Sequence, residues 1–80
     1  MEQLNLLNRT ILDIYGHRHH YIDGDRRFVE FVDGIKHWYL NGKLHREDGP
    51  AVVGLSGIKY YYINGQGLSE KEFNNRKREI

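Results

Sequence analysis

GIKHWYLNG, residues 34–42, decides the fold, because its pattern occurs three times in this chain of 80 residues. The other copies are GHRHHYIDG at residues 16–24 and GIKYYYING at residues 57–65. All three share Gly, any residue, a basic residue, two rings (imidazole counted as a ring), Tyr, Ile or Leu, Asn or Asp, and a closing Gly. Self-similarity of this kind indicates a small array of structural repeats.

Each copy has the composition of a β-strand that runs into a tight turn. Aromatic and branched side chains favour a pleated, half-buried surface. The closing Asp-Gly or Asn-Gly predicts a two-residue hairpin turn, in which both residues need positive φ. We expect further strands at residues 27–32 and 51–55, and an opening strand at residues 10–14. The sequence therefore predicts a mainly β fold: an antiparallel meander sheet of three β-hairpin-like repeats, with about six strands.

Length and repeat spacing predict one domain, residues 1–80, built from degenerate units. The units span about residues 10–33, 34–56 and 57–67. The copies start 18 and then 23 residues apart, at Gly16, Gly34 and Gly57, and the difference lies close to HREDGP, residues 45–50. This stretch is therefore not required to form a unit. We also expect a short helix at residues 2–8.

The C-terminal segment carries the signature of a short α-helix that caps the sheet, at about residues 69–78. Ser69 and Glu72 form a capping box, in which each side chain accepts a hydrogen bond from the other residue's backbone amide. Leu68 and Phe73 take the positions of a hydrophobic staple. We expect the helix to cover one end of the sheet and protect an edge that would otherwise template aggregation.

Composition limits the class of protein. The chain has no cysteine, so no disulfide or thiolate chemistry is available to it. The formal charge of +1 provides little long-range attraction to nucleic acid or anionic membranes. The N-terminal residues lack the pattern of a signal peptide, and nothing approaches membrane-spanning length. We expect a cytoplasmic protein without a membrane partner.

Alternation along the strands places the repeat residues on two faces of the sheet. One face is predicted to collect His17, His19, Tyr21, Ile35, His37, Tyr39, Ile58, Tyr60 and Tyr62. The other is predicted to collect Arg18, His20, Ile22, Lys36, Trp38, Leu40, Lys59, Tyr61 and Ile63. Cross-strand pairs worth roughly 0.2 to 1 kcal/mol each can stabilise a sheet that has only a thin core.

The ring columns predict a protein-binding surface, because Trp and Tyr give large rigid contact areas at a small entropic cost. The candidate binding residues are Trp38, Tyr39, Tyr60, Tyr61, Tyr62, His19 and His37. Which face binds and which packs is open at this point. An unpaired sheet edge also favours a homodimer, by edge pairing or by stacking of faces.

The same columns permit a different function. Rings flanked by Arg18, Lys36 and Lys59 can stack bases and hold phosphates, so a nucleic acid or a nucleotide messenger is the alternative ligand. Simple cross-strand packing, with the basic stems lying over Trp38 and Tyr61, explains the same pattern. The near-neutral charge favours packing.

Two clusters invite chemical interpretations. His45, Glu47 and Asp48 could act in catalysis, but neighbouring side chains at a turn point apart, and Asp-Gly-Pro is ordinary turn chemistry. In a repeat array, His45 and Arg46 could also bond the neighbouring turn. The imidazoles His17, His19 and His37 could converge on a metal, yet no fourth ligand is evident. We expect no enzymatic activity, no metal and no cofactor.

WYLNGKLHREDGPAVV, residues 38–53, followed by GIKYYYINGQGLSEKEF, residues 57–73, resembles a known type of repeat. Tandem W-Y-x-N-G-K-x-H-R-x-D-G-P-A repeats occur in many small bacteriophage proteins and some bacterial ones, and are similar to MORN repeats. The resemblance implies a β-hairpin array used for binding. It also implies a phage-encoded accessory protein that acts in the host cytoplasm. Such a protein would bind and inhibit a host factor of the defence type, such as a CRISPR effector or a nucleotide-signalling system. The first copy departs from the pattern, with Asp for Asn in its turn and no H-R-x-D-G-P segment.

Overall fold

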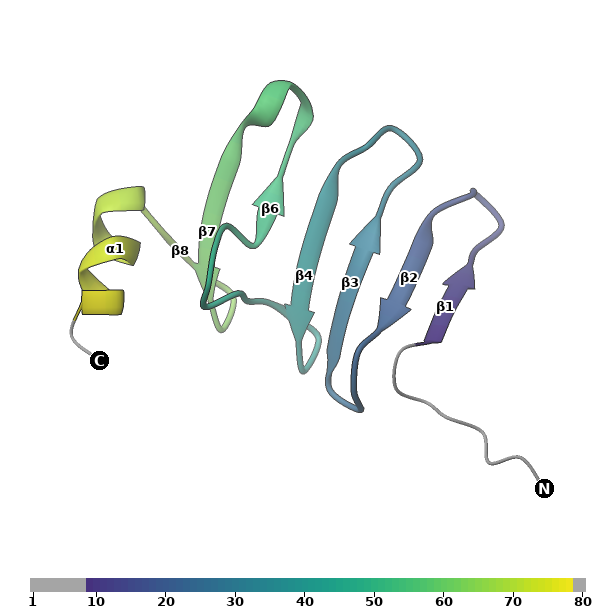
Figure 1. Cartoon of the computed structure of the whole chain (residues 1–80), viewed down its shortest axis with the longest axis horizontal. Helices are drawn as coiled ribbons and strands as arrows, with labels where there is room; N and C mark the ends of the chain where they lie inside the picture. The colour runs from purple at the N-terminus through teal and green to yellow at the C-terminus, as the bar shows by residue number, and fades with distance from the viewer. Residues whose placement is uncertain (1–8, 79–80) are drawn as a thin grey trace.

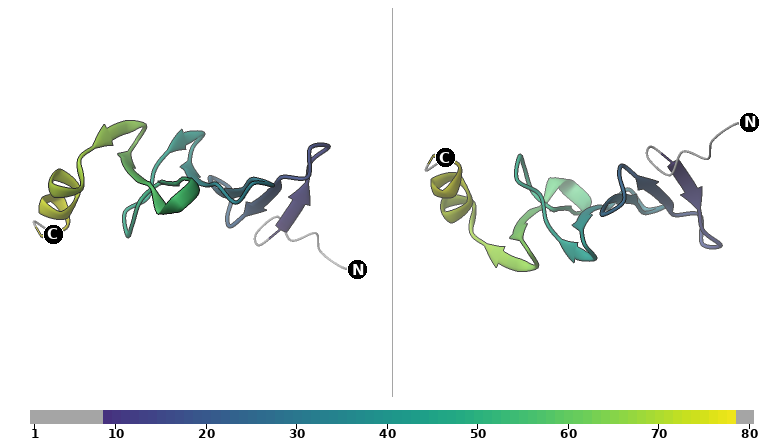
Figure 2. Two further views of the ribbon diagram at one scale, coloured as in Figure 1. Left: turned by 90° about the horizontal axis from the view of Figure 1, so that it is seen from above. Right: turned by 90° about the horizontal axis from the view of Figure 1, so that it is seen from below.

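The structure, a computed structural model, describes residues 9–78, which form a single antiparallel sheet followed by one helix (Figure 1). The elements are β1 (Arg9–Leu12), β2 (Arg18–Tyr21), β3 (Arg26–Glu30), β4 (Lys36–Leu40), β5 (Lys43–Leu44), β6 (Val52–Val53), the 3-10 turn η1 (Leu55–Gly57), β7 (Lys59–Ile63), β8 (Gln66–Leu68) and α1 (Glu70–Arg78). The molecule measures 47 × 29 × 15 Å, and the short dimension corresponds to one twisted layer (Figure 2).

The predicted meander is confirmed. The strands pair in the order β1-β2-β3-β4-β6-β7-β8, every pair is antiparallel, and β5 pairs with β4 beside β6. The sheet has eight strands where about six were expected. The two additional strands are β5 and β8, because the residues after each Asn-Gly turn pair back onto the preceding strand.

Three predicted strands extend too far at their C-terminal ends, because the turns that follow them begin earlier in the sequence than expected. The predicted strands 10–14, 27–32 and 51–55 are observed as β1, β3 and β6, which end before three similar turns. In each turn the first amide donates to the fifth carbonyl: Asp13 to His17 at 3.0 Å, Phe31 to Ile35 at 2.8 Å and Gly54 to Ile58 at 2.7 Å. The fourth residue has positive φ: Gly16 (89°), Gly34 (97°) and Gly57 (80°). The helix predicted at 2–8 lies outside the described residues.

The predicted two-residue turns are confirmed in the second and third copies. Asn41 and Gly42 have φ of 53° and 79°, and Asn64 and Gly65 have 52° and 83°. In the first copy the prediction is wrong, because neither residue of the 23–24 pair has positive φ. There the Asp side chain accepts hydrogen bonds from the amides of residues 25 and 26, and a longer loop results.

Helix α1 begins as predicted. The Ser69 amide donates to Glu72 Oε1 at 2.8 Å, and the Glu72 amide donates to Ser69 Oγ at 3.0 Å, which confirms the capping box. Phe73 is 3% exposed and its ring lies 4.7 Å from that of Tyr61, so the helix is anchored on the sheet by this contact.

The apolar core is small. Among the described residues, the buried apolar side chains are Val29, Ala51 and Phe73. A single layer cannot enclose more, so lateral contacts between neighbouring strands must supply much of the stability. The sheet therefore presents two broad faces, each crossed by rows of side chains from successive strands.

Candidate functional site

Strand register divides the predicted site residues between two faces. We call the faces the His37 face and the Trp38 face, after adjacent residues of β4. One row of the His37 face contains His19, Val29, His37, Val52 and Tyr60, and one row of the Trp38 face contains Arg18, Glu30, Lys36, Val53 and Lys59. Of the seven predicted binding residues, only Trp38 and Tyr61 lie on the Trp38 face.

The rings of the Trp38 face stack against one another. The ring centroids of His20 and Phe28 lie 5.2 Å apart with nearly parallel planes, and those of Phe28 and Trp38 lie 4.6 Å apart in the same arrangement. The Arg46 guanidinium covers the other side of Trp38 at 3.9 Å from the ring centroid. Both sides of the indole are therefore occupied, and no nucleobase can stack there without displacing a partner.

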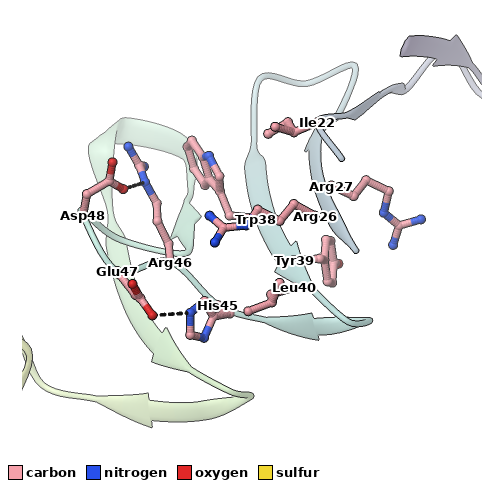
Figure 3. Close-up of a pocket in the computed structure, with 10 residues that line it drawn as sticks. All are labelled: Ile22, Arg26, Arg27, Trp38, Tyr39, Leu40, His45, Arg46, Glu47 and Asp48. Atoms are coloured by element: carbon pink, nitrogen blue, oxygen red, sulfur yellow. Dashed lines mark hydrogen bonds and ion pairs between the residues drawn. The ribbon is translucent and has the colours of Figure 1, made fainter. Parts of the chain in front are cut away.

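A shallow hollow of about 340 Å³ lies beside this stack (Figure 3). Its basic side chains include Arg26 and Arg46, and its acidic ones are Glu47 and Asp48. Arg46 Nε donates to Asp48 Oδ1 at 2.9 Å, so part of the positive charge is already neutralised. The mixture of signs gives no concentrated potential for an anionic ligand.

The HREDGP stretch joins the second unit to the third. The buried ring of His45 accepts a hydrogen bond at Nδ1 from the Asn64 amide at 2.9 Å, and its Nε2 lies 3.2 Å from Glu47 Oε2. The Arg46 amide donates to the Tyr62 carbonyl at 3.2 Å. The His45 contact agrees with the expectation that this residue bonds the neighbouring turn, whereas Arg46 bonds strand β7 through its amide and its own stretch through its side chain. Both nitrogens of the His45 imidazole are engaged.

The histidines considered as metal ligands are separated on the His37 face. The Phe31 ring lies 4.9 Å from His17 and 4.7 Å from His37, between the two imidazoles. His17 Nδ1 accepts from the Val32 amide at 3.0 Å, while His19 Nε2 bonds Asp13 Oδ2 at 2.9 Å. Within residues 9–78, no group of three or more His, Cys, Asp and Glu side chains is placed to hold a metal ion.

Two ionisable groups on this face respond to their surroundings. Burial lowers the pKa of His37 below its ordinary 6.5, since a charged imidazole is poorly solvated beside Phe31. The hydrogen bond with His19 lowers the pKa of Asp13, helped by the amides of Tyr15 and His17. Asp13 thus remains a carboxylate that organises its turn.

A group of exposed apolar side chains lies at the start of β7 and in the turn before it. Tyr60 and Ile58 are each 51% exposed, and Leu55 in the adjoining turn is 54% exposed. The other predicted residues of the His37 face, which are His19, His37, Tyr39 and Tyr62, are half-buried. We call Leu55, Ile58 and Tyr60 the β7 cluster.

The basic residues predicted for the alternative ligand form a lateral row. Arg18, Lys36 and Lys59 share one row of the Trp38 face, separated by Glu30 and Val53. Two strand spacings separate neighbouring cations, which corresponds to roughly 10 Å. The register confirms this row of cations, but the neighbouring rings of His20, Phe28 and Trp38 stack on one another and not on a ligand.

Sequence reasoning missed a further set of exposed apolar residues. The second residue of each five-residue turn is apolar and exposed: Ile14 (89%), Val32 (72%) and Leu55 (54%). These positions are 18 and 23 residues apart, like the repeat copies themselves. Aligning the turns as well as the strands would have revealed them.

Comparisons with family models, with curated proteins and with solved structures found no match. The similarity to phage and MORN-like repeats therefore stays a resemblance carried by residues 38–53 and 57–73. Across the part of the chain that the structure describes, no helix has the length and apolar character needed to span a membrane.

Proposed function

We propose that the protein is a non-enzymatic module that binds another protein through the β7 cluster on the His37 face. The observation that carries this proposal is the exposure of Leu55, Ile58 and Tyr60 together, each more than half accessible, at one end of the sheet. Grouped apolar exposure on a small protein is typical of an interaction site. Tyr60 supplies the kind of rigid amphipathic anchor that dominates interface energetics.

The division of the rings between the faces supports this choice. Trp38 packs between Phe28 and Arg46, and Tyr61 packs against Phe73, so these rings stabilise the fold. Tyr60 makes no ring contact of that kind among the described residues. Its ring is consequently available for a partner.

The resemblance to phage repeat proteins suggests what the partner is. A small accessory protein made during infection would bind and inhibit a host bacterial factor, with CRISPR effectors and other defence proteins as candidates. The action would take place in the host cytoplasm.

Affinity capture tests the proposal. The wild-type protein, the double variant Ile58→Ser/Tyr60→Ser and the control Ile22→Ser are immobilised and exposed to bacterial lysate, with mass spectrometry of the retained proteins. Ile22 is 43% exposed and lies on the Trp38 face, so its replacement changes a similar side chain at a remote position. We expect one stoichiometric host protein on wild type and on the control, and at least about a tenfold loss on the double variant. Equal retention by all three would refute the β7 cluster as the contact.

A nucleotide or nucleic-acid ligand is the second candidate, favoured by the row of Arg18, Lys36 and Lys59. Its test is fluorescence anisotropy with short single strands and with cyclic nucleotides across a salt series. Replacing Lys36 and Lys59 with Ala would abolish such binding, because phosphate contacts depend on these cations. Protein capture would decline only slightly in the same variant.

A further inference from the structure

Only the last three of the five residues of strand β7 are paired on its outer edge. Strand β8 pairs with Tyr61, Tyr62 and Ile63. On that same side, Lys59 and Tyr60 have no neighbouring strand among the described residues, since their partners in β6 lie on the opposite side. The first two residues of β7 therefore form an open sheet edge.

Hydrogen-bond alternation shows which backbone groups the open edge presents. The Gly54 amide donates to the Ile58 carbonyl at 2.7 Å, so the polar groups of Ile58 face β6. In an antiparallel strand the next residue directs its amide and carbonyl to the other side. The N–H and C=O of Lys59 thus point away from β6, toward the open edge.

The second unit shows how the equivalent edge is satisfied within this same chain. Lys36 occupies the position of Lys59 in the repeat, and it pairs with Val53, while its neighbour His37 pairs with Val52. The Trp38 amide also donates to the Ala51 carbonyl at 2.8 Å. After β5 the chain passes through HREDGP and returns as β6 to fill this edge.

The third unit lacks the returning strand. Leu68 stands at the position of His45, and the chain then enters α1 instead of an H-R-x-D-G-P-A-V-V segment. Figure 1 shows α1 on the far side of β8 from β7. An open groove of about 610 Å³ remains beside the unpaired start of β7; the residues that line it include Lys59, Tyr60, Leu68 and Ser69.

We propose that this edge accepts an extended segment of a partner protein, which pairs antiparallel with Lys59 and Tyr60. The segment has a small residue followed by two β-branched apolar residues, as in the Ala51-Val52-Val53 sequence that fills the matching edge of β4. The groove lies along the outer edge of β7, where β6 lies along the matching edge of β4, so the same chemistry fits it. This inference rests on the proposed protein-binding function and identifies the mode of binding as strand addition.

A second molecule of this protein is a poorer occupant. The exposed strand β1 could pair with β7 of another molecule, but the two edges lie at opposite ends of the sheet. Such head-to-tail pairing leaves an open edge at each end and grows without closing. A segment from a different protein ends the sheet in one step.

The test uses a peptide with the sequence EDGPAVVG, which is that of residues 47–54, and the full-length protein labelled with ¹⁵N. We expect saturable chemical-shift changes at residues 57–62 and 67–70, and slower hydrogen exchange of the Lys59 amide. The control peptide carries an N-methyl group on its second Val. It should bind at least about tenfold more weakly, because it loses the donor to the Lys59 carbonyl and cannot approach closely.

Lys59→Pro removes the outward-facing donor and tests the edge in the protein itself, with Trp38 fluorescence and circular dichroism as checks of folding. Peptide binding should be lost in this variant. Equal binding of both peptides, no binding of either, or shifts confined to another surface would overturn the inference. Concentration-dependent self-association that protects the Lys59 amide without peptide would assign the edge to a second molecule and would also overturn it.

The capture experiment separates this inference from the proposed function. A host protein that is lost from Ile58→Ser/Tyr60→Ser but retained by folded Lys59→Pro would preserve the function and refute strand addition. Peptide binding at the edge without any β7-dependent host protein would refute the function instead.

Discussion

His45→Ala tests whether a single side chain holds the second and third units together. The imidazole is 8% exposed, and its Nδ1 is the acceptor for the Asn64 amide at 2.9 Å. Alanine leaves that amide without its partner and opens a gap beneath the turn. Losing the part-buried hydrogen bond to the exposed residue Asn64 costs about 0.5 to 1.5 kcal/mol, and truncating the buried imidazole adds a cavity cost, so we expect a loss of unfolding free energy of about 1 to 3 kcal/mol.

The loss is large for a protein of this size. A single core near this length yields roughly 3 to 5 kcal/mol of net stability, and each kcal/mol lowers Tm by about 4–8 °C. Urea unfolding followed by circular dichroism gives the free energy. The fluorescence of the one tryptophan, Trp38, reports the same transition from beside the neighbouring Arg46.

Two matched variants isolate the hydrogen bond to Asn64. His45→Asn places an acceptor near the position of Nδ1 and should recover part of the loss. Glu47→Ala removes the carboxylate on the other ring nitrogen, but that side chain is 77% exposed, so we expect a change below about 0.5 kcal/mol. If His45→Ala unfolds within 0.5 kcal/mol of wild type, or no more readily than Glu47→Ala, the inter-repeat role of this side chain is refuted.

Three further outcomes follow from the structure. Burial lowers the pKa of His37, so the folded protein should be most stable above about pH 6.5, where the imidazole is neutral, and should lose unfolding free energy as the pH falls below that value. A His37 titration midpoint at or above 6.5 by NMR would contradict this prediction. Phe73→Ala should cost at least about 3 kcal/mol, which is most of the stability of a chain of this size, so helical circular dichroism should be lost. A helix signal equal to wild type would disprove the anchor of α1 on Tyr61. Replacing the exposed turn residues with Ser should reduce binding of a hydrophobic dye and leave Tm within about 3 °C, since these side chains contact little; a large fall in Tm would show that they are packed. The turn residues are Ile14, Val32 and Leu55.

Local patterns explain why the meander could be predicted from the sequence. Asn-Gly at 41–42 and 64–65 adopts the positive φ values that a two-residue turn requires, and the S-x-x-E box at Ser69 starts the helix. The first turn was mispredicted because Asp23 can organise a loop with its own carboxylate, which competes with the Asp-Gly turn. Propensity alone does not decide between these two solutions.

The site was harder to predict because the decisive contacts are not local. Trp38 has the character of a binding residue in the sequence, yet Phe28 and Arg46 cover its two sides in the fold. Whether Tyr60 or Tyr61 is accessible depends on Phe73, which reaches Tyr61 only because α1 packs against that face. Alternation correctly separated these residues into two sets, but only the tertiary contacts show which set is free.

The five-residue difference between repeat spacings has a structural meaning that extends to binding. Between the first and second units, β3 runs unbroken along β4 through five paired residues. Between the second and third, the corresponding strand is divided into β5 and β6, and the HREDGP stretch spans the interruption with side-chain bonds from His45 and Arg46. When the strand is divided, its first piece pairs only with the end of the preceding strand, so a returning segment is needed to hydrogen-bond the backbone at the start of that strand. The third unit begins the same division with β8 but ends in α1, so the capacity to accept one more strand persists at β7, beside the exposed side chains of Ile58 and Tyr60.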